Sequence, residues 1–402
     1  MAAVPFRTWR ASDDMATVAQ ECTAYTHRPM AARSLRILQV VTDTDRRGAQ
    51  VFATDLERAL RLRSHDVRTV ALAPGHNAQR LPVGVLGDER LGRRTLAALR
   101  RQMRSADVVV AHGSSTLPAC AIAGVGLRTP FVYRQISDSR FWAPTRLRRL
   151  RVRALMGRAA RVVALADHTR RELIEWIGLP ADRITVVPNG VPEDAFPLRD
   201  EAAAPAARAA LGVPEGPTAL FIAALVPEKG ADLAIDALAT VPDAHLIVAG
   251  DGPDRAALEQ RAAAVAPGRV TFTGSLPRAL DAYAAADLVV FPSRGGDSMP
   301  AALIEAGLCG LPAVTTPVGA ITDIVIDGET GVVVPIGDRE ALAATMRDLL
   351  ADPSRRRALG RAARHHCLER FAITVVAQRW ERVLLEVAGA GPAPSRPRAR
   401  VA

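Results

Sequence analysis

Short apolar runs alternate with longer amphipathic stretches along most of this chain. Residues 35–41 (LRILQVV) are mostly apolar, as is typical of a strand buried on both faces of a parallel sheet. A polar loop, 42–48, follows, and 49–63 has helical spacing. The same alternation predicts five further strands in this half of the chain, at 67–73, 108–112, 131–135, 161–166 and 184–187.

A segment rich in Pro and Ala, 191–217, interrupts the alternation, which then begins again. Six more strands are predicted there, at 219–224, 245–249, 270–273, 288–291, 313–315 and 331–334. Strands that alternate with helices of this length form parallel, doubly wound sheets. The sequence therefore predicts an α/β fold of two Rossmann-like domains that face a cleft.

Five segments follow from this pattern: a poorly ordered extension at 1–34, domains at 35–192 and 193–373, a helix at 374–388, and a disordered tail at 389–402. We expect the helix to return to the first domain. The apolar runs are strand-sized, far below the ~20 residues of a membrane span. Because no apolar segment of a leader opens the chain, we expect no secretion signal.

The four cysteines, Cys22, Cys120, Cys309 and Cys367, are scattered and read as reduced thiols of a cytoplasmic protein. The triplet 365–367 (HHC) has the composition of a metal-ligand cluster. Adjacent helical positions point in different directions, so we expect no metal site there.

The charge is uneven along the chain. Residues 1–192 hold 31 Arg and 16 acidic residues, a net +15, whereas the rest of the chain carries −5. The most basic segment, 146–161, interleaves Arg with Leu, Val and Met. It fits either a helix on the anionic inner face of a membrane or a solvated helix. Nucleic acid is the less favoured partner.

Lysine occurs once, at Lys229, in a chain that otherwise uses Arg. An ammonium is a compact point charge on a flexible stem, whereas guanidinium is a wide planar fork. A tight pocket for one phosphate oxygen would favour lysine. Chance is the competing explanation.

Chemistry-bearing residues gather after the predicted strand 288–291. Asp297, Ser298, Met299 and Pro300 lead into a helix that carries Glu305 on its second turn. Pro300 suits a first turn, Ser298 can cap it, and the free N–H groups there would face an anion. The two carboxylates could accept hydrogen bonds from one polyhydroxyl ligand. Alternatively, Asp297 caps the helix and Glu305 pairs with an Arg.

Seven motifs in order, over about residues 35–388, resemble those of glycosyltransferase family four, retaining enzymes of the two-Rossmann GT-B fold. Beside 297–305 and the following 309–314 (CGLPAV), they are 47–50 (RGAQ), 111–113 (AHG), 186–191 (VVPNGV), 227–230 (PEKG), 248–253 (VAGDGP) and 318–323 (VGAITD). The resemblance implies transfer of a sugar from a nucleoside-diphosphate sugar, in a reaction that needs no metal or cofactor.

The resemblance also implies residue roles. Lys229 would bind the donor diphosphate, Glu305 the ribose hydroxyls, and His112 would lie beside the sugar near the reacting carbon. Gly48 would let the first loop approach the diphosphate. The transferred sugar would be held by Asp297 and the backbone that follows it, and the donor-binding set is Gly48, Lys229, Asp297, Ser298, Met299, Pro300 and Glu305.

One position departs from the family's pattern. The family carries an Arg before the Leu that precedes the lysine, and this chain has Ala224 there. Arg46, Arg47 or Arg134 of the facing domain could supply the missing cation.

The acceptor is not identified by the sequence: envelope glycans in polysaccharide biosynthesis, lipid-linked saccharides and small molecules all fit. Two other functions stay open, a nucleotide-sugar epimerase of the same fold and a non-catalytic protein whose basic half binds nucleic acid or a membrane.

Overall fold

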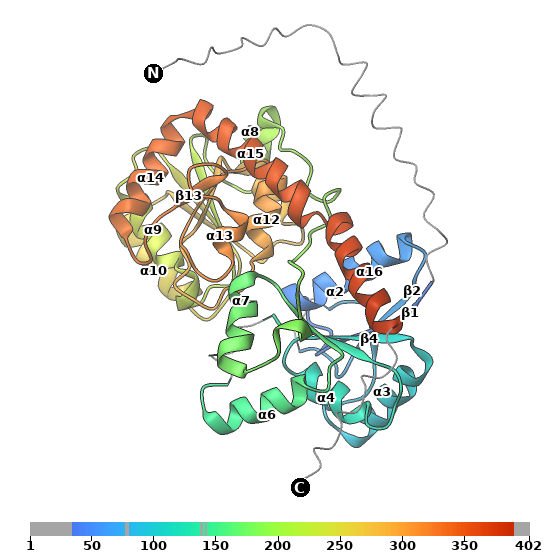
Figure 1. Ribbon diagram of the computed structural model, residues 1–402. Coiled ribbons are helices and arrows are strands. Elements are labelled where there is room, and N and C mark those ends of the chain that lie inside the picture. Colours follow the sequence, from blue (N-terminus) through green and yellow to red (C-terminus); the bar gives the residue numbers. More distant parts are fainter. Residues whose placement is uncertain (1–33, 77–79, 137–139, 141–142, 390–402) are drawn as a thin grey trace, which may run out of the picture. The chain divides into compact units, whose positions relative to one another are not determined.

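A computed structural model describes residues 34–389 except 77–79, 137–139 and 141–142 (Figure 1). The predicted extension, apart from Ser34, and the predicted tail, apart from Gly389, therefore lie outside the described residues, as does Cys22. Across the described ranges, no helix is both long and apolar enough to cross a bilayer.

The first half of the chain forms a seven-stranded parallel sheet in the order β3-β2-β1-β4-β5-β6-β7. Its strands are β1 (Arg36–Val41), β2 (Asp66–Ala71), β3 (Gly84–Val85), β4 (Val108–His112), β5 (Phe131–Arg134), β6 (Arg161–Ala164) and β7 (Ile184–Val186). The six predicted strands are confirmed to within two residues at each end. The prediction missed β3, because its two residues are both exposed and do not form an apolar run.

The second half forms a six-stranded parallel sheet in the order β10-β9-β8-β11-β12-β13, and all six predicted strands are confirmed. They are β8 (Thr218–Ile222), β9 (His245–Ala249), β10 (Val270–Gly274), β11 (Leu288–Phe291), β12 (Ala313–Thr315) and β13 (Gly331–Val333). The predicted fold class is therefore correct.

Helices cover both sheets. They are α2 (Gly48–Leu62), α3 (Arg93–Ser105), α4 (Thr116–Ala123), α6 (Arg146–Met156), α7 (Asp167–Glu172), α8 (Ala204–Ala210), α9 (Ala231–Ala239), α10 (Arg255–Val265), α11 (Leu280–Ala285), α12 (Ala301–Leu308), α13 (Ile321–Ile324), α14 (Arg339–Ala351), α15 (Pro353–Phe371) and α16 (Ile373–Gly389). Single helical turns occupy Leu173–Ile177, Ala181–Arg183, Glu201–Ala203 and Pro227–Lys229; the last is called η4.

The last helix, α16, packs on the first sheet although it follows the helices of the second (Figure 1). Its apolar side, which includes Val376, Trp380 and Leu384, shares one buried cluster with Ile37 of β1 and Leu56 of α2. Trp380 is fully buried there. The C-terminal helix therefore stabilises the first sheet and not the second.

Each sheet has a topological switch point, where neighbouring strands leave toward opposite faces. In the first sheet it lies between β1 and β4, and in the second between β8 and β11. Ligands of open α/β sheets bind at the carboxyl ends of such strands. The loops after β8 and β11 carry the two motifs that the sequence singled out, 227–230 and 297–305.

Candidate active site

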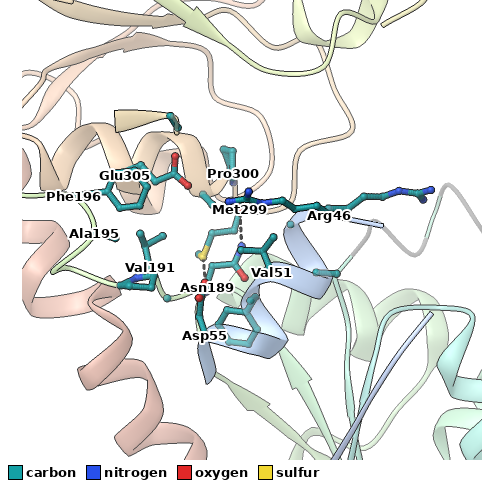
Figure 2. A pocket seen from close by; sticks show the side chains of 18 of the residues that line it. Arg46, Val51, Asp55, Asn189, Val191, Ala195, Phe196, Met299, Pro300 and Glu305 are labelled. Carbon is teal, nitrogen blue, oxygen red and sulfur yellow. Dashed lines mark hydrogen bonds between the residues drawn. The ribbon is translucent and has the colours of Figure 1, made fainter. Parts of the chain in front are cut away.

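A pocket of about 700 Å³ lies between residues of the two halves (Figure 2). This volume is in the range of small-molecule sites. The second half contributes the loop 276–280, the loop 296–301 and Glu305, and the first half contributes the start of α2, Arg134 and the connection 189–196. Of the predicted site residues, nine line it: Arg46, Arg47, Gly48, Arg134, Asp297, Ser298, Met299, Pro300 and Glu305. Lys229 and His112 do not.

Lys229 reaches the pocket through another residue, because its ammonium forms an ion pair and hydrogen bond with the carboxylate of Asp297. Both side chains are well shielded, with 19% and 7% of their surfaces exposed. Asp297 also accepts a hydrogen bond from the hydroxyl of Ser293. The lone lysine and the first acidic residue of the donor motif, 68 positions apart, thus share one site.

The prediction that the side chain of Ser298 or Asp297 caps the helix after Pro300 was wrong. Within the described residues, no side chain caps α12, whose first helical residue follows Pro300. Asp297 instead faces Lys229, and Ser298 is fixed through its backbone. The free N–H groups at the start of α12 are therefore left toward the pocket, where they favour an anion.

At two glycines near this site, the backbones of neighbouring loops approach each other closely. Gly230 has φ +73°, and a Cβ there would lie 2.2 Å from the carbonyl oxygen of Pro292. Gly319 has φ +58°, and its Cβ would lie 1.8 Å from the carbonyl oxygen of Asp297. Next to it, the Ala320 amide donates a hydrogen bond to the Ser298 carbonyl at 2.8 Å. Backbone contacts that only glycine allows therefore fix the position of Asp297.

Glu305 lies on the pocket wall beside Phe196, opposite Val51 and Asp55 of α2 (Figure 2). Its carboxylate accepts a hydrogen bond from the Tyr283 hydroxyl at 2.8 Å. Among the described residues no Arg pairs with it, so the alternative reading of Glu305 as an ion-pair partner is wrong. Burial raises the pKa of Glu305 to about 7, against the opposing effects of the Tyr283 hydrogen bond and the Arg46 charge.

His112 lies behind the pocket wall and not on it. Its ring is 1% exposed, packs beside Phe52 and Trp380, and shares a hydrogen bond of 2.9 Å with the side chain of Gln39. Burial and the nearby Arg134 charge lower its pKa well below the usual value, so the ring is neutral at pH 7. Phe52 lines the pocket in its place. Contact between His112 and a sugar stays a prediction.

The three candidate arginines differ in their surroundings. Arg47 pairs with the buried Asp45 at 2.6 Å. Arg46 is exposed and extends along the pocket (Figure 2). Arg134 is buried and donates a hydrogen bond to the side chain of Asn189. Ala224, where the family carries Arg, is exposed and does not line the pocket.

Gly48 begins α2 and is exposed at the pocket. A Cβ there would meet nothing within 4 Å in the described part of the chain. The protein itself therefore leaves space at this position, and the proposed close approach could only involve a ligand.

Asn189 is the residue that sequence reasoning missed. Its side-chain amide donates to the Met299 carbonyl at 2.6 Å, its backbone N–H lies 3.1 Å from the Met299 sulfur, and its side-chain oxygen accepts from Arg134. It thus connects β5 with the loop 297–300. Asn189 belongs to the motif 186–191, which indicated that this segment matters. The motif did not indicate that the Asn189 side chain contacts Arg134 and Met299.

The described cysteines, Cys120, Cys309 and Cys367, are buried free thiols whose pKa burial raises to about 12. No group of three or more His, Cys, Asp or Glu side chains suited to a metal ion occurs in the described ranges.

Comparison with known proteins agrees with this architecture. HepE of Anabaena, solved in complex with UDP and glucose, superposes with a TM-score of 0.78 over 88% of this chain and all of its own, at 22% identity. At that identity the likeness shows the fold alone, which is the GT-B fold of glycosyltransferases.

Two family models match the chain in order. Residues 46–195 match Glycosyltransferase Family 4, and residues 205–366 match Glycosyl transferases group 1. The chain belongs to this family of group 1, family 4 glycosyltransferases.

The curated relatives match this chain over only part of their own length. A GDP-mannose-dependent phosphatidylinositol monomannoside mannosyltransferase of Mycolicibacterium smegmatis is 32% identical over 57% of this chain and 63% of its own length. An exopolysaccharide phosphotransferase of Streptomyces coelicolor is 29% identical over 74% of this chain and 31% of its own. The chain thus spans less than two thirds of either relative.

We expect Gly319→Ala to disturb the position of Asp297. The new methyl group must displace the Asp297 carbonyl, an overpacking that costs about 1–3 kcal/mol of unfolding free energy beyond the strain of the left-handed backbone. Gly328→Ala is the matched control, because Gly328 has φ +73° but open space around its Cα. Urea denaturation of both variants measures the difference, and equal losses would contradict the close contact.

The raised pKa of Glu305 predicts that stability depends on pH. Between its ordinary value of 4.5 and about 7, the folded protein binds more protons at this site than the unfolded chain. The free energy of unfolding should therefore fall by about 1–3 kcal/mol as the pH rises through that window. Glu305→Gln should flatten the curve, and the exposed Glu340→Gln should not. If the free energy of unfolding depends on pH in the same way in all three proteins, the pKa of Glu305 is not raised by burial.

Proposed function

We propose that this protein transfers a sugar from a nucleoside-diphosphate sugar to an acceptor hydroxyl, with retention of the anomeric configuration. The observation that carries the proposal is the convergence of Asp297, fixed by Lys229, and Glu305 on one wall of a ligand-sized pocket. One carboxylate can accept hydroxyls of the transferred sugar and the other those of the ribose. Membership of the family supports the same reading.

The donor diphosphate would lie between Lys229 and the N-terminus of α12. An ammonium has three donors, so Lys229 can hold Asp297 and a phosphate oxygen together. The free N–H groups of α12 and of α2, which lacks a side-chain cap among the described residues, add a favourable field. Arg46 is the exposed cation that can replace the one lost at Ala224.

The reaction would exchange one C–O bond for another. The bond between the anomeric carbon and the diphosphate breaks, the acceptor oxygen bonds to that carbon from the same face, and the acceptor proton passes to the departing phosphate. The nucleoside diphosphate leaves. Nothing is oxidised or reduced, and cationic side chains can neutralise the departing charge, so we include no metal or cofactor in the proposal.

Similar proteins leave the base open, since one is named as GDP-mannose-dependent and another was solved with UDP. They name a phosphoinositide and an exopolysaccharide, which keeps envelope glycans and lipid-linked acceptors in view beside small molecules. We propose a cytoplasmic protein on the basis of the free thiols of Cys120, Cys309 and Cys367.

The surface of α6 supports a location at the inner face of a membrane. Leu147 and Leu150 of this helix are 79% and 59% exposed. Five arginines interleave with them, at 146, 148, 149, 151 and 153. Exposed apolar side chains among cations are typical of helices that bind anionic bilayers.

We expect one class of nucleotide sugar, among UDP-, GDP- and ADP-sugars, to raise the thermal midpoint. A ligand at 100 times its Kd adds about 2.7 kcal/mol of apparent stability. Lys229→Met should weaken this shift and lower kcat about 10²–10³-fold, the usual loss for one electrostatic contact to the transition state. Arg339→Met, at an exposed position of α14, is the control.

No response to any nucleotide sugar would contradict the proposal. Consumption of the donor without acceptor, giving an altered free sugar, would instead indicate the epimerase. Salt-sensitive binding to nucleic acid alone would indicate a binding protein.

A further inference from the structure

Arg134 is a buried cation on the wall of the pocket. It ends β5, and 1% of its surface is exposed. The face of its guanidinium lies over the Phe52 ring, with Cζ 3.8 Å from the ring centroid. One amino group, Nη2, donates a hydrogen bond to the Asn189 side chain.

The charge of Arg134 is not neutralised by the described protein. No carboxylate in the described ranges lies within 4.0 Å of it, and its Nε and Nη1 atoms have no hydrogen-bond partner there. Arg199 and Arg208 give the contrast, because they are less deeply buried than Arg134 and yet both pair with Asp287. These two partly buried arginines thus have an acidic partner, whereas the more deeply buried Arg134 has none among the described residues.

An unpaired buried charge is costly, so it is retained where a ligand supplies the counter-charge. Burial lowers the pKa of Arg134 to about 9, which still leaves a cation at pH 7. Its two free donors, Nε and Nη1, belong to the planar fork that matches the oxygens of phosphate or carboxylate. The missing partner is therefore an oxyanion.

We propose that Arg134, positioned by Asn189, binds a phosphate or carboxylate group carried by the acceptor. This assignment to the acceptor rests on the proposed function. The groups assigned to the donor belong to the second half of the chain: Lys229 lies in the η4 turn after β8, Asp297 in the loop after β11, and Glu305 in α12. Arg134 comes from the first sheet, and its hydrogen bond to Asn189, which in turn donates to the Met299 carbonyl, links it to that wall.

The position of Asn189 gives the bound anion a place in the reaction. Asn189 holds Arg134 with its side-chain oxygen and the Met299 carbonyl with its side-chain amide. An acceptor anion on Arg134 would therefore lie next to the loop assigned to the transferred sugar. The acceptor would be an anionic saccharide, lipid headgroup or polyol phosphate and not a neutral glycan.

Phosphorus NMR tests the proposal, because inorganic phosphate and UDP or GDP give separate signals. Inorganic phosphate is titrated into the full-length protein, alone and with saturating nucleoside diphosphate. We expect phosphate to bind in both cases. Arg134→Met should weaken it at least about tenfold, as loss of charge-assisted hydrogen bonds predicts, and should leave nucleotide affinity unchanged within about twofold. Arg128→Met, an exposed position before β5, should change neither.

Other outcomes would overturn the proposal. Competition between phosphate and the nucleotide, with nucleotide affinity lost in Arg134→Met, would assign Arg134 to the donor diphosphate. Phosphate binding that survives the substitution, or no phosphate binding by the parent protein, would make Arg134 a structural residue. The titration without nucleotide is independent of the proposed function, so the two can fail separately.

Folding of the variant is checked by its thermal midpoint. We expect Arg134→Met to have an equal or higher midpoint than the parent, because methionine removes an unpaired buried charge at similar volume. If Arg134→Met does not fold, Arg134→Lys replaces it: the charge stays, the fork is lost, and phosphate affinity should fall while nucleotide affinity holds. Unchanged phosphate affinity in Arg134→Lys would contradict recognition by the fork.

Discussion

The ion pair between Lys229 and Asp297 is the interaction on which the site depends. It joins the turn after β8 to the loop after β11, the two segments that the strand order brings to one edge of the second sheet. Gly230 and Gly319 allow the backbone of neighbouring loops to approach closely enough to fix both partners. Each charge is the counter-charge of the other. An anion beside Lys229 and a hydroxyl beside Asp297 would then complete the site.

The first sheet contributes charge of a different kind. Arg134 is buried beside Phe52 and lacks a carboxylate partner among the described residues, whereas the partly buried Arg199 and Arg208 of the second half share Asp287. Asn189 connects this cation to Met299 and so links the two walls of the pocket. The pocket thus combines a wall of carboxylates suited to hydroxyls with a facing cation suited to an oxyanion.

The sequence predicted the fold more completely than the contacts. Buried parallel strands are apolar on both faces, so their apolar runs predicted twelve strands. The strand β3 has only two residues, both exposed, and no apolar run predicted it. The motifs placed Asp297 and Glu305 on the pocket wall, but the direction of a side chain depends on distant partners. Asp297 meets Lys229 instead of capping α12, His112 is covered by Phe52, and the role of Asn189 depends on contacts with residues 55 and 110 positions away. No local rule gives such contacts.

Hydrogen–deuterium exchange in the presence of the nucleoside-diphosphate sugar that stabilises the protein tests the central claim most directly. The account predicts slower exchange in three segments that are far apart in sequence, the η4 turn, the loop 296–300 with the start of α12, and the loop 276–280. The surface of α10 should exchange as before. Protection confined to one of these segments, or located outside them, would show that Lys229, Asp297 and Glu305 do not share a ligand.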